Sequence, residues 1–170
     1  MHRELDNESV KWSVAGGQWR THAEQSAAAR KLLGEMLGSE VAVEHDTAGR
    51  PYLPDRSDLY ISISHCRMAV AVAVSTRGPV GIDVECRRKI GDSLVKRVCT
   101  PDECALVEAG SDPTMTFLQL WTRKEAVLKC RGTGIKGFGS MVEALAATDC
   151  EVADIDTGLP DAVAALATAV

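Results

Sequence analysis

The chain has 170 residues, of which 45% are hydrophobic and 25% charged, and its formal net charge is −5. This size and composition are typical of a globular protein, built as one domain or as two small halves packed together. Nucleic-acid binding would need a local basic patch strong enough to overcome the acidic balance. No apolar run approaches the length of a membrane span, and the N-terminus has no signal-peptide core.

The cysteines are scattered along the chain and form no C-x-x-C pair. They are Cys66, Cys86, Cys99, Cys104, Cys130 and Cys150. Such spacing matches neither a zinc site nor the framework of a disulfide-rich secreted domain. We therefore predict a cytoplasmic protein with reduced thiols, most of which pack as small hydrophobic side chains.

In the N-terminal part, residues 1–20 show no pattern that assigns them to an element. Residues 21–37 (THAEQSAAARKLLGEML) predict a helix, because alanine and leucine favour helices and the apolar positions recur at helical spacing. Gly38 follows as a stop signal. A short strand is predicted at 41–46, and residues 47–58 predict a loop by their Gly, Pro and Asp content.

Three strands are predicted next, in close succession. Residues 59–66 (LYISISHC) alternate regularly, with the two isoleucines on one face and the two serines on the other. Residues 67–75 (RMAVAVAVS) predict a second strand, and a turn at 76–79 leads to a third strand at 80–85 (VGIDVE).

The C-terminal part begins with a basic stretch and continues with helices. Residues 100–110 predict a short helix with a capping box, and residues 112–132 predict the best-defined helix of the chain. The Gly-rich segment 131–139 follows a helix instead of opening one, so it reads as the helix exit and not as a phosphate-binding loop. The apolar segment 161–170 fits a strand or a helix.

This order of elements predicts an α+β fold. Each half contributes one long helix and some strands, which suggests two similar subdomains at residues 1–79 and 80–170.

Two carboxylates stand on the third predicted strand. Asp83 and Glu85 are two residues apart and therefore point to the same face, where they repel each other. One interpretation is a strand whose polar face is open to water. The other is a divalent-cation site, since Mg²⁺ prefers hard oxygen ligands, with Glu125 as a third carboxylate if its helix faces this strand.

The long predicted helix carries a stripe of functional side chains. Trp121, Glu125 and Lys129 are spaced four residues apart and lie along one face, and Lys124 stands beside them. Glu125 and Lys129 form the pair that often stabilises a solvated helix surface. The same geometry would present a carboxylate and an ammonium to a cleft, and both interpretations stay open.

Ser64 and His65 close the first of the three strands. They do not form a catalytic pair, because adjacent strand residues point to opposite faces. A histidine at a strand end is ordinarily a polar cap. Its alternative use is phosphate binding, together with Arg50 from the GRP loop and Arg30 or Lys31 from the first helix.

Four motifs in this order, GRP, YISISHC, VGIDVE and WTRKEAVLK, resemble the 4′-phosphopantetheinyl transferases, specifically the larger surfactin-type (Sfp-type) class. The resemblance runs from about Ala27 to Ile135, and the final apolar segment resembles the family's last strand. It implies two pseudo-symmetric α/β halves with coenzyme A in the cleft between them. It also implies Mg²⁺-dependent transfer of the 4′-phosphopantetheine arm from coenzyme A to a serine of an acyl- or peptidyl-carrier protein, with release of 3′,5′-ADP.

The resemblance also implies roles for individual residues. Asp83, Glu85 and Glu125 would hold Mg²⁺, or Mn²⁺ in its place, and Asp83 thereby belongs to the catalytic set. Glu125 would accept the serine proton. Lys129 and Lys124 would contact phosphates, with Lys129 steadying the leaving group.

For the 3′-phosphate and adenine end of coenzyme A, the resemblance implies Arg30, Lys31, Arg50, Ser64 and His65. The family usually has an additional strand and a basic segment before the first helix. Residues 1–20 give no sign of either, so a shortened N-terminal half is expected, with Lys31 supplying charge where relatives often have Thr. A monomer is the default expectation, and the short N-terminal half leaves an oligomer open.

A basic cluster follows the third strand and reads as solvated side chains or, because carrier proteins are typically acidic, as a carrier-docking surface. Its members are Arg87, Arg88, Lys89, Lys96 and Arg97. Two other functional classes compete with the transferase. One is a non-catalytic binding module for coenzyme A or carrier protein, which would not need a complete metal triad. The other is a Mg²⁺-dependent phosphohydrolase, for which the sequence offers no motif that positions an attacking water.

Overall fold

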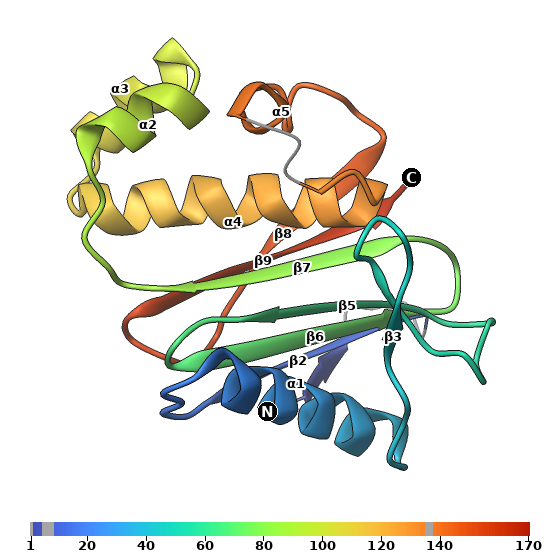
Figure 1. The fold of residues 1–170 in the computed structure, drawn as a ribbon. Helices are drawn as coiled ribbons and strands as arrows, with labels where there is room; N and C mark the ends of the chain where they lie inside the picture. The colour runs from blue at the N-terminus through green and yellow to red at the C-terminus, as the bar shows by residue number, and fades with distance from the viewer. Residues whose placement is uncertain (1, 5–8, 135–137) are drawn as a thin grey trace.

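The computed structural model describes residues 2–4, 9–134 and 138–170 (Figure 1). It is a mixed α/β structure. Its strands are β1 (His2–Glu4), β2 (Val10–Gly16), β3 (Glu44–His45), β4 (Pro51–Tyr52), β5 (Tyr60–His65), β6 (Ala69–Ser75), β7 (Val80–Cys86), β8 (Cys150–Ile155) and β9 (Ala162–Ala169). Its helices are α1 (His22–Leu37), α2 (Asp92–Val98), α3 (Pro101–Ala109), α4 (Pro113–Arg131) and α5 (Phe138–Val142).

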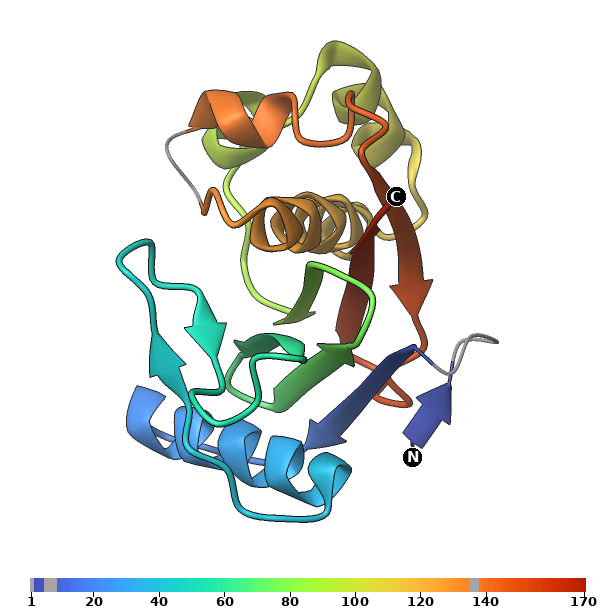
Figure 2. The same ribbon diagram turned by 90° about the vertical axis from the view of Figure 1, so that its right-hand side faces the viewer.

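Two antiparallel sheets lie between helices (Figures 1 and 2). The first sheet has the order β1-β2-β6-β5 and is covered on its outer face by α1. The second has the order β7-β9-β8 and is covered by α4, with α2, α3 and α5 beyond it. A third small pairing, β3 with β4, stands beside the first sheet. In the described part of the chain, no helix is both long and apolar enough to cross a membrane.

The hydrophobic core is layered in the same way. Small and β-branched side chains of β2 and β6 pack against those of β7 and β9 between the sheets, for example Ala71 and Val14 against Ile82 and Leu166. The opposite face of β6 packs on α1. Because β6 is buried on both faces, its sequence is an unbroken apolar run, as is typical of a central strand.

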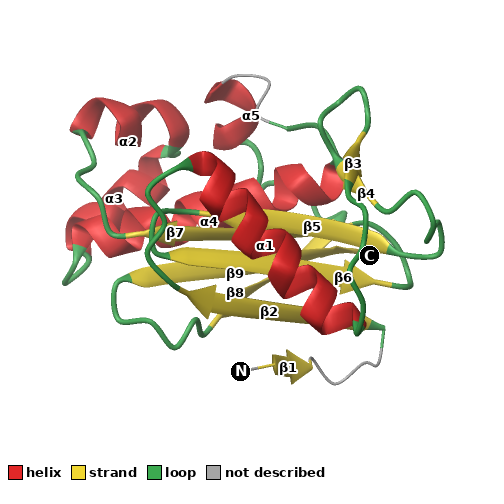
Figure 3. Ribbon diagram, turned by 60° about the horizontal axis from the view of Figure 1, so that its bottom comes forward, coloured by secondary structure: helices red, strands yellow, loops and turns green. Residues whose placement is uncertain are grey.

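The strands β5 and β7 lie side by side (Figure 3), and serine hydroxyls of β5 join the two sheets there. The Oγ of Ser62 accepts a hydrogen bond from the backbone N–H of Ile82 at 3.0 Å, and the Oγ of Ser64 accepts one from Val84 at 3.3 Å. These side chains satisfy two backbone donors on the edge of β7 that faces away from β9. The predicted serine face of β5 therefore lies against β7. We call this contact between β5 and β7 the seam between the sheets.

The first predicted helix and the helix at 112–132 are confirmed as α1 and α4. Thr21 and Glu24 form a capping box at the start of α1, and Gly38 ends it in the left-handed conformation at φ 75°. Gly132 ends α4 in the same way at φ 69°. The segment at 161–170, which fitted a strand or a helix, contains the strand β9.

The unassigned segment 1–20 contains strands. One of them, β2, is paired along its whole length with β6, while the shortened N-terminal half stays a prediction. The pattern of β2 was hard to read because Val10, Trp12 and Val14 face the core while Ser13, between them, is buried as well. The loop predicted at 47–58 includes the two-residue strand β4, and the basic stretch before 100 includes α2. Ile135, the predicted end of the family resemblance, lies outside the described residues with the rest of 135–137.

The cysteine prediction is wrong at one pair. Cys66 and Cys86, twenty residues apart in sequence, are joined by a disulfide, whereas Cys99, Cys104, Cys130 and Cys150 are free. The pair could not be read from spacing, because the folding of β5, β6 and β7 brings these positions together. The cytoplasmic location stays a prediction.

Candidate active site

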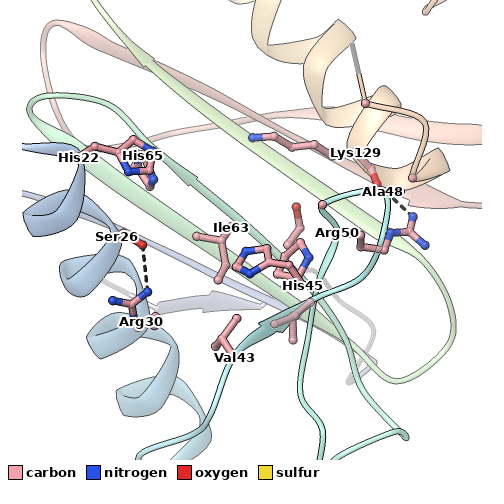
Figure 4. Close-up of a pocket in the computed structure, with 16 residues that line it drawn as sticks. His22, Ser26, Arg30, Val43, His45, Ala48, Arg50, Ile63, His65 and Lys129 are labelled. Atoms are coloured by element: carbon pink, nitrogen blue, oxygen red, sulfur yellow. Dashed lines mark hydrogen bonds between the residues drawn. The ribbon is translucent and has the colours of Figure 1, made fainter. Parts of the chain in front are cut away.

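A cavity of about 350 Å³ lies between α1, the 43–51 segment, β5 and the C-terminal end of α4 (Figure 4). Most of its polar lining is cationic or imidazole: His22, Arg30, His45, Arg50, His65 and Lys129. Arg30, Arg50, His65 and Lys129 come from four separate segments and were each predicted as phosphate-binding residues. The structure brings them to one cavity, and this lining fits an anionic ligand.

The arginines of the cavity are held by neighbouring polar groups. Arg30 donates to the Oγ of Ser26 at 3.1 Å, one turn earlier on α1. Arg50 donates to the carbonyl of Lys129 at 3.1 Å and to that of Cys130, so its guanidinium caps the end of α4. Lys31 does not join them: it is exposed and pairs with Glu35 at 2.5 Å. The structure therefore gives no support to the prediction that Lys31 binds the ligand.

Two histidines of the cavity contact each other. The rings of His22 and His65 meet edge to face with their centroids 4.6 Å apart. Burial lowers the pKa of His65, and the charges of His22 and Lys129 lower it further. The Nδ1 of His65 is buried without a hydrogen-bond partner among the described residues. Sequence reasoning missed His22 and His45, because nothing in their local patterns indicates that they line the same cavity as His65.

Beside the cavity, Asp83 is only 5% exposed. Its Oδ1 accepts hydrogen bonds from the Oγ of Ser64 and from the Nζ of Lys129, each at 2.7 Å. Its Oδ2 is buried and has no partner within the described part of the chain. This burial rules out the interpretation of Asp83 as part of a polar strand face open to water.

Glu85 and Glu125 are close enough to Asp83 to feel its charge. Burial raises the pKa of Glu125 to about 7, repulsion by Asp83 and Glu85 adds to the rise, and Lys129 opposes it. Burial and Asp83 also raise the pKa of Glu85, against the effect of Arg88, whose Nε lies 3.3 Å from its carboxylate. The three carboxylates therefore form one mutually repelling cluster. The stripe on α4 faces β7 and is not a solvated helix surface.

Gly81 explains how close the helix comes to the strand. A Cβ placed on it would lie 1.9 Å from the carbonyl oxygen of Ala126 and 2.6 Å from the backbone nitrogen of Cys130. The backbones of β7 and α4 are thus in direct contact, which a side chain at this position would prevent. This contact places Asp83 within reach of Lys129.

The carboxylate cluster was tested for its fit to a divalent cation. The structure holds no group of three or more His, Cys, Asp or Glu side chains ready to bind a metal, as far as its described residues go. The chemistry of the cluster nevertheless fits Mg²⁺: the donors are hard oxygens, and the Oδ2 of Asp83 is buried without a partner. A cation here would also offset the repulsion that raises the pKa of Glu85 and Glu125.

The prediction that Lys124 contacts phosphates is wrong. Its side chain is completely buried on the other side of α4. Its Nζ donates to the carbonyl of Val98 at 2.9 Å and to the carboxylate of Glu103 at 2.6 Å. Lys124 therefore links α2 and α3 to α4. Because it lies one residue before Glu125 on the helix, its side chain points to a different side, into the core.

The basic cluster after β7 is largely engaged within the protein. Arg87 pairs with Asp112 and with Asp161, the latter at 2.9 Å. Arg88 pairs with Glu85 and lies 5.9 Å from the ring centre of Trp121. The guanidinium of Arg97 stacks over Phe138 at 3.8 Å. Arg87 is the member that already pairs with two carboxylates. A carrier-docking role for this cluster stays a prediction.

The sequence was compared with known proteins. A family model described as the 4′-phosphopantetheinyl transferase superfamily matches residues 79–166, which include β7, α4 and the first part of β9. This chain belongs to the 4′-phosphopantetheinyl transferase superfamily. The resemblance read from the four motifs is thereby confirmed.

Several curated members of the superfamily are similar to the chain. The 4′-phosphopantetheinyl transferase HetI of Nostoc sp. is 35% identical over 130 residues, which are 71% of this chain and 55% of HetI. The transferase Sfp of Bacillus subtilis is 30% identical over 62% of this chain and 53% of its own length. AcpT of Salmonella typhimurium is 29% identical over 74% of this chain and 69% of its own length. The chain thus spans about half the length of HetI and Sfp.

Proposed function

We propose that this protein transfers the 4′-phosphopantetheine arm of coenzyme A to a serine hydroxyl of an acyl- or peptidyl-carrier protein and releases 3′,5′-ADP. The observation that carries the proposal is the position of Lys129. Its side chain lines the cationic cavity and donates to Asp83 of the carboxylate cluster. A pyrophosphate bound between the cavity and a metal ion at the cluster would therefore also lie beside the ammonium group of Lys129. Transfer of a phosphoryl group depends on such positioning and on neutralisation of the phosphate charge.

In the proposed reaction, the cavity binds coenzyme A at its anionic end. Arg30 and His65, which line the cavity, would bind its 3′-phosphate, and Arg50, which also lines it, caps α4. Lys129 would contact the pyrophosphate and neutralise charge that develops on the departing phosphate. The pathway of the carrier and the tolerance for acylated coenzyme A are not part of the proposal.

Asp83, Glu85 and Glu125 would hold Mg²⁺, or Mn²⁺ in its place, which when bound neutralises pyrophosphate oxygens. Glu125 would accept the proton of the carrier serine, directly or through water. Its place in the carboxylate cluster, where it feels the charges of Asp83 and Lys129, supports this role. Asp83 orients Lys129 by accepting its hydrogen bond.

We also propose that residues 1–79 and 80–170 are two pseudo-symmetric halves with the active site between them. The order of elements supports this: β2, α1, β5 and β6 in the first half correspond to β7, α4, β8 and β9 in the second. In both sheets the last strand of the set lies between the other two, as β2-β6-β5 and β7-β9-β8. One chain supplies both the cavity and the carboxylate cluster, so we propose that a monomer is active.

The proposal is tested by incubating the protein with coenzyme A, Mg²⁺ and an apo carrier protein, and weighing the carrier by mass spectrometry. The expected result is the addition of one phosphopantetheine group, abolished by EDTA and by Glu125→Gln. Tight binding of coenzyme A without transfer to any of several carriers would contradict the proposal. That outcome would favour the non-catalytic binding module instead.

A further inference from the structure

The two serines of β5 occupy nearly equivalent places in the seam, but their hydrogen bonds differ. Each accepts a backbone N–H of β7, and each is buried, with 4% of Ser62 and 7% of Ser64 exposed. A serine hydroxyl has one hydrogen to donate. Ser64 donates it to the Oδ1 of Asp83 at 2.7 Å. For Ser62, no contact to a carboxylate is found among the described residues.

The bond from Ser64 has a consequence for Asp83. Two donors, Ser64 and Lys129, converge on Oδ1, whereas the buried Oδ2 receives none from the residues that the structure describes. Rotation of the carboxylate would break both bonds to Oδ1. The more mobile of the two donors is Lys129, which sits at the end of a long side chain. Ser64 lies on a strand and is fixed by its own bond to Val84.

We propose that Ser64 is a positioning residue, which holds the Asp83 carboxylate so that Oδ2 is left free for a divalent cation. The inference deepens the proposed function and rests on it. It replaces the expected role of Ser64 as a ligand of the 3′-phosphate. Ile63 and His65 line the cavity, but Ser64 is not among its described lining residues, and its one hydrogen is already donated.

The test compares Ser64→Ala with Ser62→Ala, a matched control that loses the same kind of bond to a backbone N–H of β7. Mn²⁺ binding is measured by electron paramagnetic resonance, without coenzyme A or carrier. Residues that orient metal ligands typically change affinity at least tenfold when mutated. We therefore expect about tenfold weaker Mn²⁺ binding for Ser64→Ala, and a change of less than about twofold for Ser62→Ala.

Three results would overturn the proposal. They are equal Mn²⁺ affinity in the two variants, absence of Mn²⁺ binding by the wild-type protein, and weaker binding of coenzyme A by Ser64→Ala than by the wild-type protein in EDTA. The last would assign Ser64 to the phosphate instead. If Ser64→Ala does not fold, Ser64→Cys and Ser62→Cys replace the pair, and equal affinity again overturns the inference.

Failure of the inference can be told apart from failure of the proposed function. Wild-type protein that binds Mn²⁺ but transfers nothing would refute the transferase, while the comparison of the two serines would still decide the role of Ser64. Wild-type protein that transfers the arm while both alanine variants bind Mn²⁺ equally well would refute the role of Ser64 alone.

Discussion

Two lysines five residues apart on α4 have opposite surroundings. Lys129 is half-buried at the edge of the cavity, where it bonds to Asp83 and to the carbonyl of Ile82. Lys124 is completely buried and bonds to Glu103 and to the carbonyl of Val98. The first lines the cavity and meets the carboxylate cluster, and the second joins helices in the core, although the motif KEAVLK presents them in one run.

Replacing Lys124 by Met tests this distinction. The change leaves the carboxylate of Glu103, which is 13% exposed, without its ammonium partner. Breaking a buried ion pair by removing one partner typically costs about 3–5 kcal/mol. We therefore expect the free energy of unfolding in urea to fall by an amount of this order. In the matched variant Lys129→Met, the expected main effect is loss of transfer. A stable Lys124→Met protein with a raised KM for coenzyme A would contradict this assignment.

Glu125 makes stability depend on pH when no metal is bound. Its pKa in the folded protein, about 7, lies above the ordinary value of 4.5. A raised carboxyl pKa means that the charged form is disfavoured in the fold, so the stabilisation present below pH 4.5 is lost as the pH rises through 7. Glu125→Gln has no charge to bury and avoids this loss.

In EDTA, Glu125→Gln and the wild-type protein should have similar stability at pH 4.5, and the variant should become more stable as the pH rises to about 7.5. Partial exposure of the side chain reduces the gain, which we expect to be about 1–3 kcal/mol. Urea unfolding across this pH range measures it. A constant difference between the two proteins over the whole range would show that the pKa of Glu125 is not raised.

At the scale of elements, the contact of β7 with α4 decides the geometry of the site. Gly81→Ala would place a methyl group inside the helix backbone at Ala126. Since neither backbone can yield locally, α4 must move away from β7, taking Lys129 away from Asp83. Overpacking of this kind costs about 1–3 kcal/mol, and we expect both lower stability and loss of transfer.

Gly78→Ala is the matched control, because a Cβ at Gly78 meets nothing within 4 Å and φ there is not positive. Urea unfolding and the carrier assay would be run on both variants. Full transfer activity in Gly81→Ala would mean that the close approach of β7 and α4 is not required for the site.

The elements differ in how well their sequences predict them. α1 and α4 carry caps at both ends and a helical pattern, so local signals were sufficient. β2 lies between other strands and has covered faces, so its sequence lacks the simple alternation of a half-exposed strand. On β5, the alternation identified a serine face, but a local pattern could not show that this face meets β7. The sequence was sufficient to predict that Asp83, Glu125 and Lys129 lie close together. The burial of Lys124 could not be predicted, because it depends on how α2 and α3 pack.

For the whole molecule, the connections between the first sheet with α1 and the second sheet with α4 matter most. The cavity takes residues from both, with Arg30 and His65 on one side and Lys129 on the other. Arg50 reaches across to the end of α4, and the serines of β5 bond to β7. Separation of the two sheets would therefore dismantle the cavity and also remove Ser64 from Asp83.

The disulfide between Cys66 and Cys86 adds a covalent connection at this boundary. Cys66 directly follows His65 of the cavity, and Cys86 directly follows Glu85 of the carboxylate cluster. The bond closes a loop of about twenty residues, which in the chain-entropy model stabilises the fold by about 3 kcal/mol. Reduction should lower the free energy of unfolding by up to this amount.

Thiol labelling of the unfolded chain tests whether the bond forms. A maleimide should label Cys99, Cys104, Cys130 and Cys150 before reduction and all six cysteines after it. The double variant Cys66→Ser/Cys86→Ser should be destabilised to about the same extent as the reduced wild-type protein, and dithiothreitol should not destabilise it further. Labelling of all six cysteines without reductant would contradict the disulfide. In that case the two sheets would be held together by the serine hydrogen bonds from β5 to β7, by Arg50 and by the packing between them.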